Sequence, residues 1–469
     1  MTSAGSPRSV PIYLVTVDSL RYDAVGAFGG NDGRGLTPNI DGLAADGVRF
    51  TEAAAAAPAT IYSFLGSFTS TYPLDGAETT EGRPSLTAEL SDVGYRTAGF
   101  HSNPFLSSHY GFDRGFEVFE DFTGASDDDA DIHGRSGLGE RIMKRVKSTL
   151  TAYPRVHDHA KELKNFIDPP YTRAGPITEA VLDDAGFGDD ARTFHWVHYM
   201  DSHHPYYPEP EYMDLPFVPS LSSARRVRLA ALIDVVKRDG ADPDVSERDI
   251  RDLRALYDAQ VHRVDDAVGR LLDGLKDAGV YDDALIVFAS DHGDEFLEHG
   301  SLGHSPQLYD ELVHVPLIIK PPADEPRKHV DTVDSSVSYL DLAPTILTMA
   351  DAPVPEEMVG NSVARSLETG QTERDVAPSE FLHEDERLFS VRNSAWKFIR
   401  DEVHGREELY DLERDPHETN DVRAKESNQA SQLRAFIDQR VDSVQAGAGS
   451  AYDDIDQAMA SRLEDLGYL

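Results

Sequence analysis

Four apolar runs rich in β-branched and aromatic residues interrupt the polar background of the chain and predict buried strands. They cover residues 11–17, 193–199, 284–289 and 313–319. The first run leads directly into Asp18, the second into the polar segment 201–205, and the third into the polar segment 290–293. Continuous apolar runs of this kind are typical of parallel strands that are covered on both faces.

Helical patterns lie between these strands. Apolar residues recur every three to five positions from 253 to 278, which predicts an amphipathic helix. They are Leu256, Val261, Val264, Val268, Leu271 and Leu275. Strands alternating with helices predict a doubly wound α/β sheet, in which functional residues collect beyond the carboxyl ends of the strands.

The pattern also divides the chain. We expect a large α/β domain over residues 9–369 and a small α+β domain with a tail over 370–469. In the second part, short strand-like pieces at 388–392, 396–400 and 407–411 precede a helix near 429–444. A looser stretch at 124–190, acidic and then basic, predicts a helical insertion over the site.

Charge and cysteine content exclude several functions. The 469 residues include no cysteine and carry a formal net charge of −40. No thiolate metal site or cysteine nucleophile can form, and nucleic acid and anionic lipid would be repelled. The acids are spread along the chain and only about ten of the 44 basic residues are lysine. This favours a halophilic protein over one that uses an acidic tail to bind a basic partner.

No apolar run approaches the roughly 18–20 residues that a membrane-spanning helix needs. The first ten residues contain neither a twin-arginine pair nor a hydrophobic signal segment. We therefore expect a cytoplasmic protein without a membrane span.

Three residues that follow buried strands are candidate metal ligands. Asp18, Asp291 and His292 combine carboxylate oxygen with imidazole, a set that suits calcium, magnesium, manganese or zinc. A lone Asp at a strand end is more often a helix cap or turn former. The Asp-His-Gly sequence at 291–293 is more specific, and it strengthens the interpretation of Asp18.

Thr60 is a candidate nucleophile. It opens a predicted helix after Ala57-Pro-Ala, and a hydroxyl beside a divalent ion at a helix start could ionise. Spacing alone favours a simpler role, in which Thr60 caps that helix.

A series of different short motifs extends along nearly the whole chain in a characteristic order. They are Val17–Asp23, Thr37–Asp41, Phe50, Ala57–Pro58, Thr69–Pro73, Gly94–Thr97, Gly111–Phe116, His198–His203, Pro205–Tyr206, Tyr257–Val261, Ser290–Gly293, Glu298–Gly300, Gly303–His304, His314–Pro316 and Glu408–Pro416. In this order and spacing the chain resembles the sulfatase family of the alkaline phosphatase superfamily. The resemblance implies a mixed, mostly parallel sheet flanked by helices, with a small C-terminal α+β domain.

The resemblance also implies roles for individual residues. Asp18, Asp291 and His292 match the family's ligands for a divalent ion, most often calcium, and Thr60 matches the nucleophile position. His203 matches the histidine that faces the substrate ester. His304 matches a Lys or His placed against the transferring group.

The chain departs from the family pattern around the nucleophile. Formylglycine-dependent members have Cys or Ser there, followed by proline and arginine, whereas this chain has Thr60 followed by Ile-Tyr-Ser63-Phe64. Threonine cannot become that aldehyde because its Cβ carries a methyl group. Ser19 replaces a second acidic ligand, and Asn103 falls where a cationic stretch is usual. We therefore expect Asn103 and Ser63 to contact the substrate.

These departures favour phosphate chemistry. A phosphothreonine can be resolved by water or a second alcohol, whereas a threonine sulfate lacks the exit that formylglycine provides. We predict a hydrolase or transferase acting through Thr60 on a small-molecule, glycan-linked or lipid-linked ester. Sulfate ester hydrolysis by metal-activated water remains an alternative, and so does a catalytically degenerate binding protein.

Overall fold

A computed structural model describes residues 10–30, 33–76, 79–123, 154–189, 192–239, 245–323, 329–383 and 386–444. Its main sheet has eight strands in the order β11-β2-β10-β7-β1-β6-β4-β5. Their bounds are β1 Ile12–Val17, β2 Val48–Phe50, β4 Arg96–His101, β5 Val118–Asp121, β6 Thr193–Tyr199, β7 Leu285–Ser290, β10 Leu317–Lys320 and β11 Thr332–Val333. The strands from β7 to β5 run parallel, and β10 is antiparallel to both of its neighbours.

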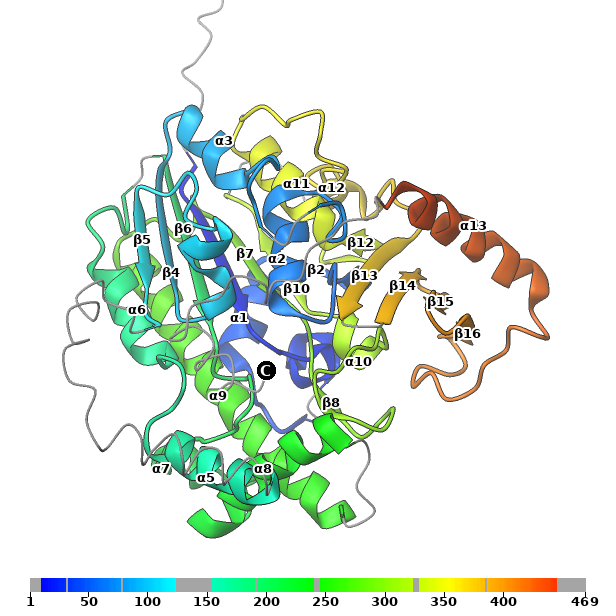
Figure 1. Cartoon of the computed structure of the whole chain (residues 1–469). Coiled ribbons are helices and arrows are strands. Elements are labelled where there is room, and N and C mark those ends of the chain that lie inside the picture. Colours follow the sequence, from blue (N-terminus) through cyan, green and yellow to red (C-terminus); the bar gives the residue numbers. More distant parts are fainter. Residues whose placement is uncertain are drawn as a thin grey trace, which may run out of the picture.

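Alternating side chains of β1 point into two separate apolar layers. Tyr13, Val15 and Val17 pack with helices on one face of the sheet, and Ile12 and Leu14 pack with helices on the other. The first face is covered by α1 Pro38–Asp46, α6 Ala174–Asp183 and α9 Glu247–Asp277. The second is covered by α2 Thr60–Thr69, α3 Leu86–Asp92 and α11 Leu342–Met349 (Figure 1). The predicted mostly parallel α/β sheet flanked by helices is therefore confirmed.

The run at 313–319 differs from its prediction. Only its second half is a strand, because α10 ends at Val313 and β10 begins at Leu317. Pro316 has no N–H to donate and separates the two. Val313 and Val315 are nevertheless fully buried, so their apolar character reflects packing rather than strand structure.

A second, antiparallel sheet follows the main one. It consists of β13 Ala377–His383, β14 Glu386–Arg392, β15 Trp396–Asp401 and β16 Arg406–Asp411, and α13 Ser427–Ser443 packs on β14 and β15. Its apolar face belongs to the same buried cluster as α2 and α11. The strands and the helix predicted for the C-terminal part are confirmed. Residues 445–469 of the predicted tail and residue 9 lie outside the described residues.

Residues 124–153 of the predicted insertion also lie outside the described residues. In its described remainder, α5 Pro154–Ile167 packs on α8 Ser223–Asp239, whereas α6 packs on α9 and β6. The other described elements are short: α7 Pro210–Met213, α10 Asp310–Val313, α12 Ser366–Thr369, β3 Ala53–Ala54, β8 Glu295–Phe296, β9 Leu302–Gly303 and β12 Val337–Ser338. No described helix is both long and apolar enough to cross a membrane.

Candidate active site

Three neighbouring strands end at the same edge of the main sheet. Val17 of β1 lies between Tyr199 of β6 and Ser290 of β7. Asp18 follows Val17 and Asp291 follows Ser290, so this pairing brings the two carboxylates together. His292 Nε2 lies 3.8 Å from Asp18 Oδ1 and 3.7 Å from Asp291 Oδ2. The three predicted metal ligands therefore form one buried group.

Within this group, atoms that can only accept hydrogen bonds point toward one another. His292 Nδ1 lies 2.9 Å from the Gly293 carbonyl, and because a carbonyl can only accept, Nδ1 carries the hydrogen and Nε2 the lone pair. Asp291 Oδ1 accepts from the N–H groups of Ser19 and His292, whereas its Oδ2 is buried without a hydrogen-bond partner among the described residues.

His198 on β6 belongs to the same group, although no role was predicted for it. Its Nδ1 lies 3.0 Å from Thr16 Oγ1, which already donates to the Val197 carbonyl. Thr16 thereby holds one side of the imidazole ring, and on the other side His198 Nε2 contacts Asp18 Oδ2 at 3.4 Å. One nitrogen of His198 and one oxygen from each of Asp18 and Asp291 lie within 4.8 Å of one another.

These residues fit a divalent cation. Asp18 and Asp291 are 0% and 2% exposed, and burying two carboxylates together is costly without a positive partner. Burial raises the pKa of Asp291 well above the ordinary carboxyl value, and the neighbouring charge of Asp18 raises it further. Burial opposes ionisation of Asp18 as well, but the adjacent imidazoles lower its pKa. Carboxylate oxygens with imidazole nitrogens are a donor set for such an ion.

Thr60 points into this group from the start of α2. Its Oγ1 lies 3.3 Å from Asp18 Oδ2 and 3.5 Å from His292 Nε2, and the residue is 1% exposed. The N-cap residue of α2 is Ala59, and no side-chain bond caps this helix. The capping role considered for Thr60 is therefore not observed.

The two predicted substrate contacts lie in the same place but bind protein atoms. Ser63 Oγ donates to the Asp291 carbonyl at 2.6 Å. Asn103 Nδ2 donates to Asp18 Oδ2 at 2.9 Å, while its Oδ1 accepts from the Phe105 N–H. Both side chains thus form hydrogen bonds with the candidate metal ligands or their backbone.

The predicted catalytic histidines lie beside the metal group. His304, just beyond β9, has its ring centroid 4.7 Å from that of His292 and 5.0 Å from that of His203. His204, the next residue in the chain, stacks on His203 with ring centroids 4.3 Å apart. Burial lowers the pKa of His203 to about 4, so this imidazole is neutral near pH 7.

Two further ionisable residues border the histidines. Burial raises the pKa of Asp294 to about 7 and lowers that of Lys237, on α8, to about 8. Lys237 acts electrostatically on His203 and His304. Asp294 could have been inferred from its place three residues after Asp291. Lys237 could not, because nothing in the sequence of α8 indicates which side chain reaches the site.

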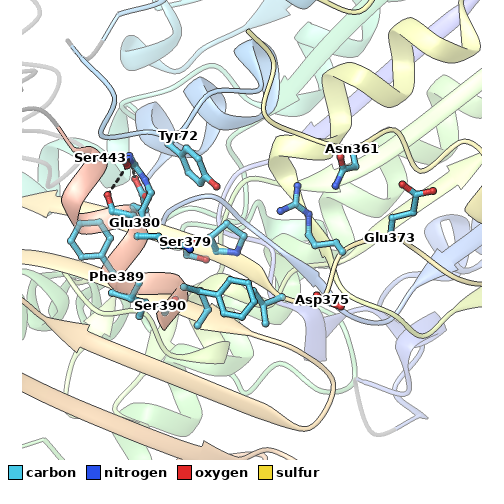
Figure 2. A pocket seen from close by; sticks show the side chains of 17 residues that line it. Tyr72, Asn361, Glu373, Asp375, Ser379, Glu380, Phe389, Ser390 and Ser443 are labelled. Atoms are coloured by element: carbon cyan, nitrogen blue, oxygen red, sulfur yellow. Dashed lines mark hydrogen bonds and ion pairs between the residues drawn. The ribbon is translucent and has the colours of Figure 1, made fainter. Parts of the chain in front are cut away.

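A cavity of about 350 Å³ lies elsewhere, and none of its lining residues belongs to this site. Tyr72 and Asn361 line one part of it, and Ser379, Glu380, Phe389 and Ser390 of β13 and β14 line another (Figure 2). Ser443 from α13 closes the wall beside Glu380.

Comparison with known proteins gives consistent similarities. The sulfatase family model matches residues 12–352, and the model of the N-sulphoglucosamine sulphohydrolase C-terminal region matches 298–446. The chain is 26% identical over 421 residues to the uncharacterized sulfatase YidJ of Escherichia coli, covering 87% of this chain and 82% of that protein. It is 28% identical to arylsulfatase K of Xenopus laevis over 211 residues, 41% of this chain and 38% of that protein.

The structure also has close neighbours. The phosphonate monoester hydrolase of Agrobacterium radiobacter superposes with a TM-score of 0.68 at 20% identity, covering 92% of this chain and 95% of that one. At this identity the likeness establishes the fold, which is of the alkaline-phosphatase type.

Proposed function

The chain belongs to the sulfatase family, and from that premise we propose that it is a metal-dependent ester hydrolase that works through Thr60 on phosphate esters. The observation that carries this proposal is the position of the Thr60 hydroxyl. It lies at the N-terminus of α2, buried, within 3.3–3.5 Å of Asp18 and His292. The helix dipole favours negative charge at that position.

Asp18, Asp291 and His292 would hold the divalent ion, with His198 as a fourth donor. Calcium is the ion that the family resemblance favours, and the imidazoles also suit manganese or zinc. A bound divalent ion would favour the ionised form of the Thr60 hydroxyl and offset charge on the ester. Asn103 and Ser63 keep the ligands in place through the bonds described above.

The proposed reaction has two displacements. Thr60 Oγ1 attacks phosphorus, the bond from phosphorus to the ester oxygen breaks, and the Thr60 proton is passed to the leaving alcohol. Water then attacks phosphorus, the bond to Thr60 breaks, and one proton of that water returns to the threonine oxygen. We propose that His203 and His304 face the transferring group, where they stabilise its oxygens or carry the proton to the leaving oxygen.

Phosphate is favoured over sulfate because threonine cannot form the aldehyde hydrate that releases sulfate. Hydrolysis of sulfate esters by an activated water is the second candidate, and the sulfatases among the relatives support it. A binding protein without catalysis is the third, and the complete set of Asp18, Asp291, His292 and Thr60 argues against it. The organic part of the substrate is a small molecule, glycan or lipid.

Two measurements test the proposal. Phosphomonoester, phosphodiester and aryl sulfate should be assayed side by side with several divalent metals in high salt. Acid quenching during phosphodiester turnover should then yield a phosphorylated peptide containing Thr60 by mass spectrometry. Turnover of aryl sulfate alone, with no modified Thr60 peptide, would favour the second candidate. The absence of both turnover and metal would favour the third.

We also propose that the protein is adapted to high salt, since a net charge of −40 is spread over the whole chain. Mobile ions screen the self-repulsion of such a surface. Refolding should therefore be efficient in molar salt and poor in dilute buffer. Full stability in dilute buffer would contradict this.

A further inference from the structure

Three buried imidazoles lie together beside the proposed metal group. His203 and His204 follow β6 and His304 follows β9, and their exposed fractions are 0%, 3% and 7%. The ring centroid of His304 lies 5.0 Å from that of His203 and 5.3 Å from that of His204. One nitrogen from each of the three rings lies within 4.8 Å of the other two. We refer to these residues as the three-histidine cluster.

The hydrogen bonds of the cluster direct lone pairs inward. His203 Nδ1 contacts the His204 carbonyl, so Nδ1 carries the hydrogen and Nε2 carries the lone pair. Ligating histidines in metal sites commonly donate their second N–H to a backbone carbonyl in this way. Thus His203 is held in the tautomer that a metal ligand requires.

His204 has a more unusual environment. Both of its ring nitrogens are buried, and neither has a hydrogen-bond partner among the described residues. A neutral imidazole has one donor and one acceptor, and leaving a buried polar group unpaired is unfavourable. A ligand bound at His204 would remove part of that cost.

His304 has a carboxylate behind it. Asp294 Oδ1 lies 3.5 Å from His304 Nδ1, and the other carboxylate oxygen accepts from the Tyr206 hydroxyl. A carboxylate that orients a histidine by its second nitrogen recurs around protein-bound zinc. In this structure the two atoms are at ion-pair distance, so Asp294 lies on the Nδ1 side of the His304 ring.

We propose that His203, His204 and His304 form a second metal site, which takes a zinc-like divalent cation. Three neutral nitrogen donors favour such an ion over calcium or magnesium, which prefer oxygen. Zinc–nitrogen bonds of about 2.0–2.1 Å place tetrahedral donors about 3.3 Å apart, a spacing that lies inside the 4.8 Å limit found for the three nitrogens.

The inference rests on the proposed active site but not on Thr60 chemistry. An ion in the cluster would give His203 and His304 an indirect role, in which they act on the ester through a shared cation. The alternative occupant of the three-histidine cluster is an oxyanion. The positively charged ammonium of Lys237 acts electrostatically on all three imidazoles and would attract an anion. Metal binding and anion binding must therefore be measured separately.

The experiment counts metal on the full-length chain. Chelator-treated wild type, His204→Gln and Asp291→Asn are equilibrated with zinc in high salt, desalted and analysed by elemental mass spectrometry. Cobalt titrations followed by visible absorption report the nitrogen-rich site separately. We expect two ions on wild type and one on each variant. The cobalt bands should persist in Asp291→Asn, and cobalt affinity should fall at least about tenfold in His204→Gln.

Two results would overturn the inference: an unchanged metal content and cobalt spectrum in His204→Gln, or a single wild-type ion that Asp291→Asn alone removes. Binding of inorganic phosphate to metal-free wild type, lost in His204→Gln, would assign the cluster to an oxyanion instead. Circular dichroism checks folding, and His304→Gln is the second variant if His204→Gln does not fold. Metal counts do not depend on Thr60, so Thr60→Ala should retain both ions even if the proposed phosphate chemistry is wrong.

Discussion

His198 Nε2 faces Asp18 Oδ2 at 3.4 Å in the buried centre of the sheet edge. Its orientation is set by Thr16, whose hydroxyl forms a hydrogen bond with His198 Nδ1 and accepts another from the Trp196 indole. A threonine on β1 thus determines which nitrogen of a β6 histidine meets the carboxylate. This arrangement makes Thr16 a positioning residue for the proposed metal group.

Replacing Thr16 by valine tests that role with little change in volume. Thr16→Val removes the hydrogen-bond partner of His198 Nδ1, and loss of such an outer partner weakens metal binding by about 10–100-fold. Isothermal titration of the chelator-treated protein with calcium and manganese measures the affinity. The matched control is Thr345→Val, a buried threonine on α11 whose hydroxyl bonds only backbone groups. Equal affinity in the two variants would contradict the assignment.

Replacing Thr60 separates nucleophilic chemistry from hydrolysis by water. Thr60→Ala should lower kcat for the preferred ester by a factor of 10² or more, since the attacking oxygen is removed, and roughly 10²-fold is a typical loss for one catalytic group. Thr60→Ser keeps the hydroxyl and should retain most of the activity. Initial rates at saturating substrate measure both. Full activity in Thr60→Ala would eliminate the covalent route.

A variant of Ser63 can distinguish a role in positioning Asp291 from direct contact with the substrate. Ser63 Oγ donates to the Asp291 carbonyl, so Ser63→Ala should lower kcat by about tenfold through a displaced ligand, at a cost of about 1 kcal/mol in stability. KM should hardly change, whereas a residue that binds the substrate directly would raise KM. Ser67→Ala, on the same helix and bonded within it, serves as the control.

Much of the site was predictable because strand ends are visible in sequence. Asp18, Asp291 and His292 follow apolar runs, and parallel pairing of β1 with β7 necessarily brings such ends together. His198 was not predictable, because the sequence of β6 does not indicate that Thr16 orients this imidazole toward Asp18. Lys237 reaches the site from α8 only through tertiary packing. The prediction of a strand over 313–319 was wrong in its first half for a similar reason. The residues beside Pro316 are apolar because they are buried, and a buried apolar run has the same composition as a strand.

Lys397 on β15 joins the C-terminal sheet to α10 through a buried ion pair. Its Nζ lies 2.8 Å from Asp310 on α10 and 3.0 Å from Glu418, and the lysine is fully buried. Lys397→Met leaves both carboxylates without this cation, and breaking a buried pair costs about 3–5 kcal/mol. Thermal unfolding in high salt should show a large fall in Tm. Lys276→Met, which removes an exposed pair with Asp273, should shift Tm by little, and a similar shift in both variants would contradict the prediction.

His299 should make stability depend on pH. Its Nδ1 lies 2.5 Å from Glu311 and its Nε2 lies 3.1 Å from the Glu418 carbonyl. Although burial opposes protonation, these acceptors raise the pKa of His299 to about 9, compared with about 6.5 in the unfolded chain. A raised pKa stabilises the fold fully below pH 6.5, and this contribution is lost as pH rises through 9.

The comparison of wild type with His299→Gln isolates this contribution from the many other charges. The difference in their free energies of unfolding should be largest near pH 6 and should shrink by at most about 3 kcal/mol by pH 10. Denaturant titrations at several pH values measure it. In a Glu311→Gln background the pH-dependent part should largely vanish, because the main partner of the imidazolium is gone. A difference that is constant with pH, or one that grows as pH rises, would show that His299 is not held protonated in the folded protein.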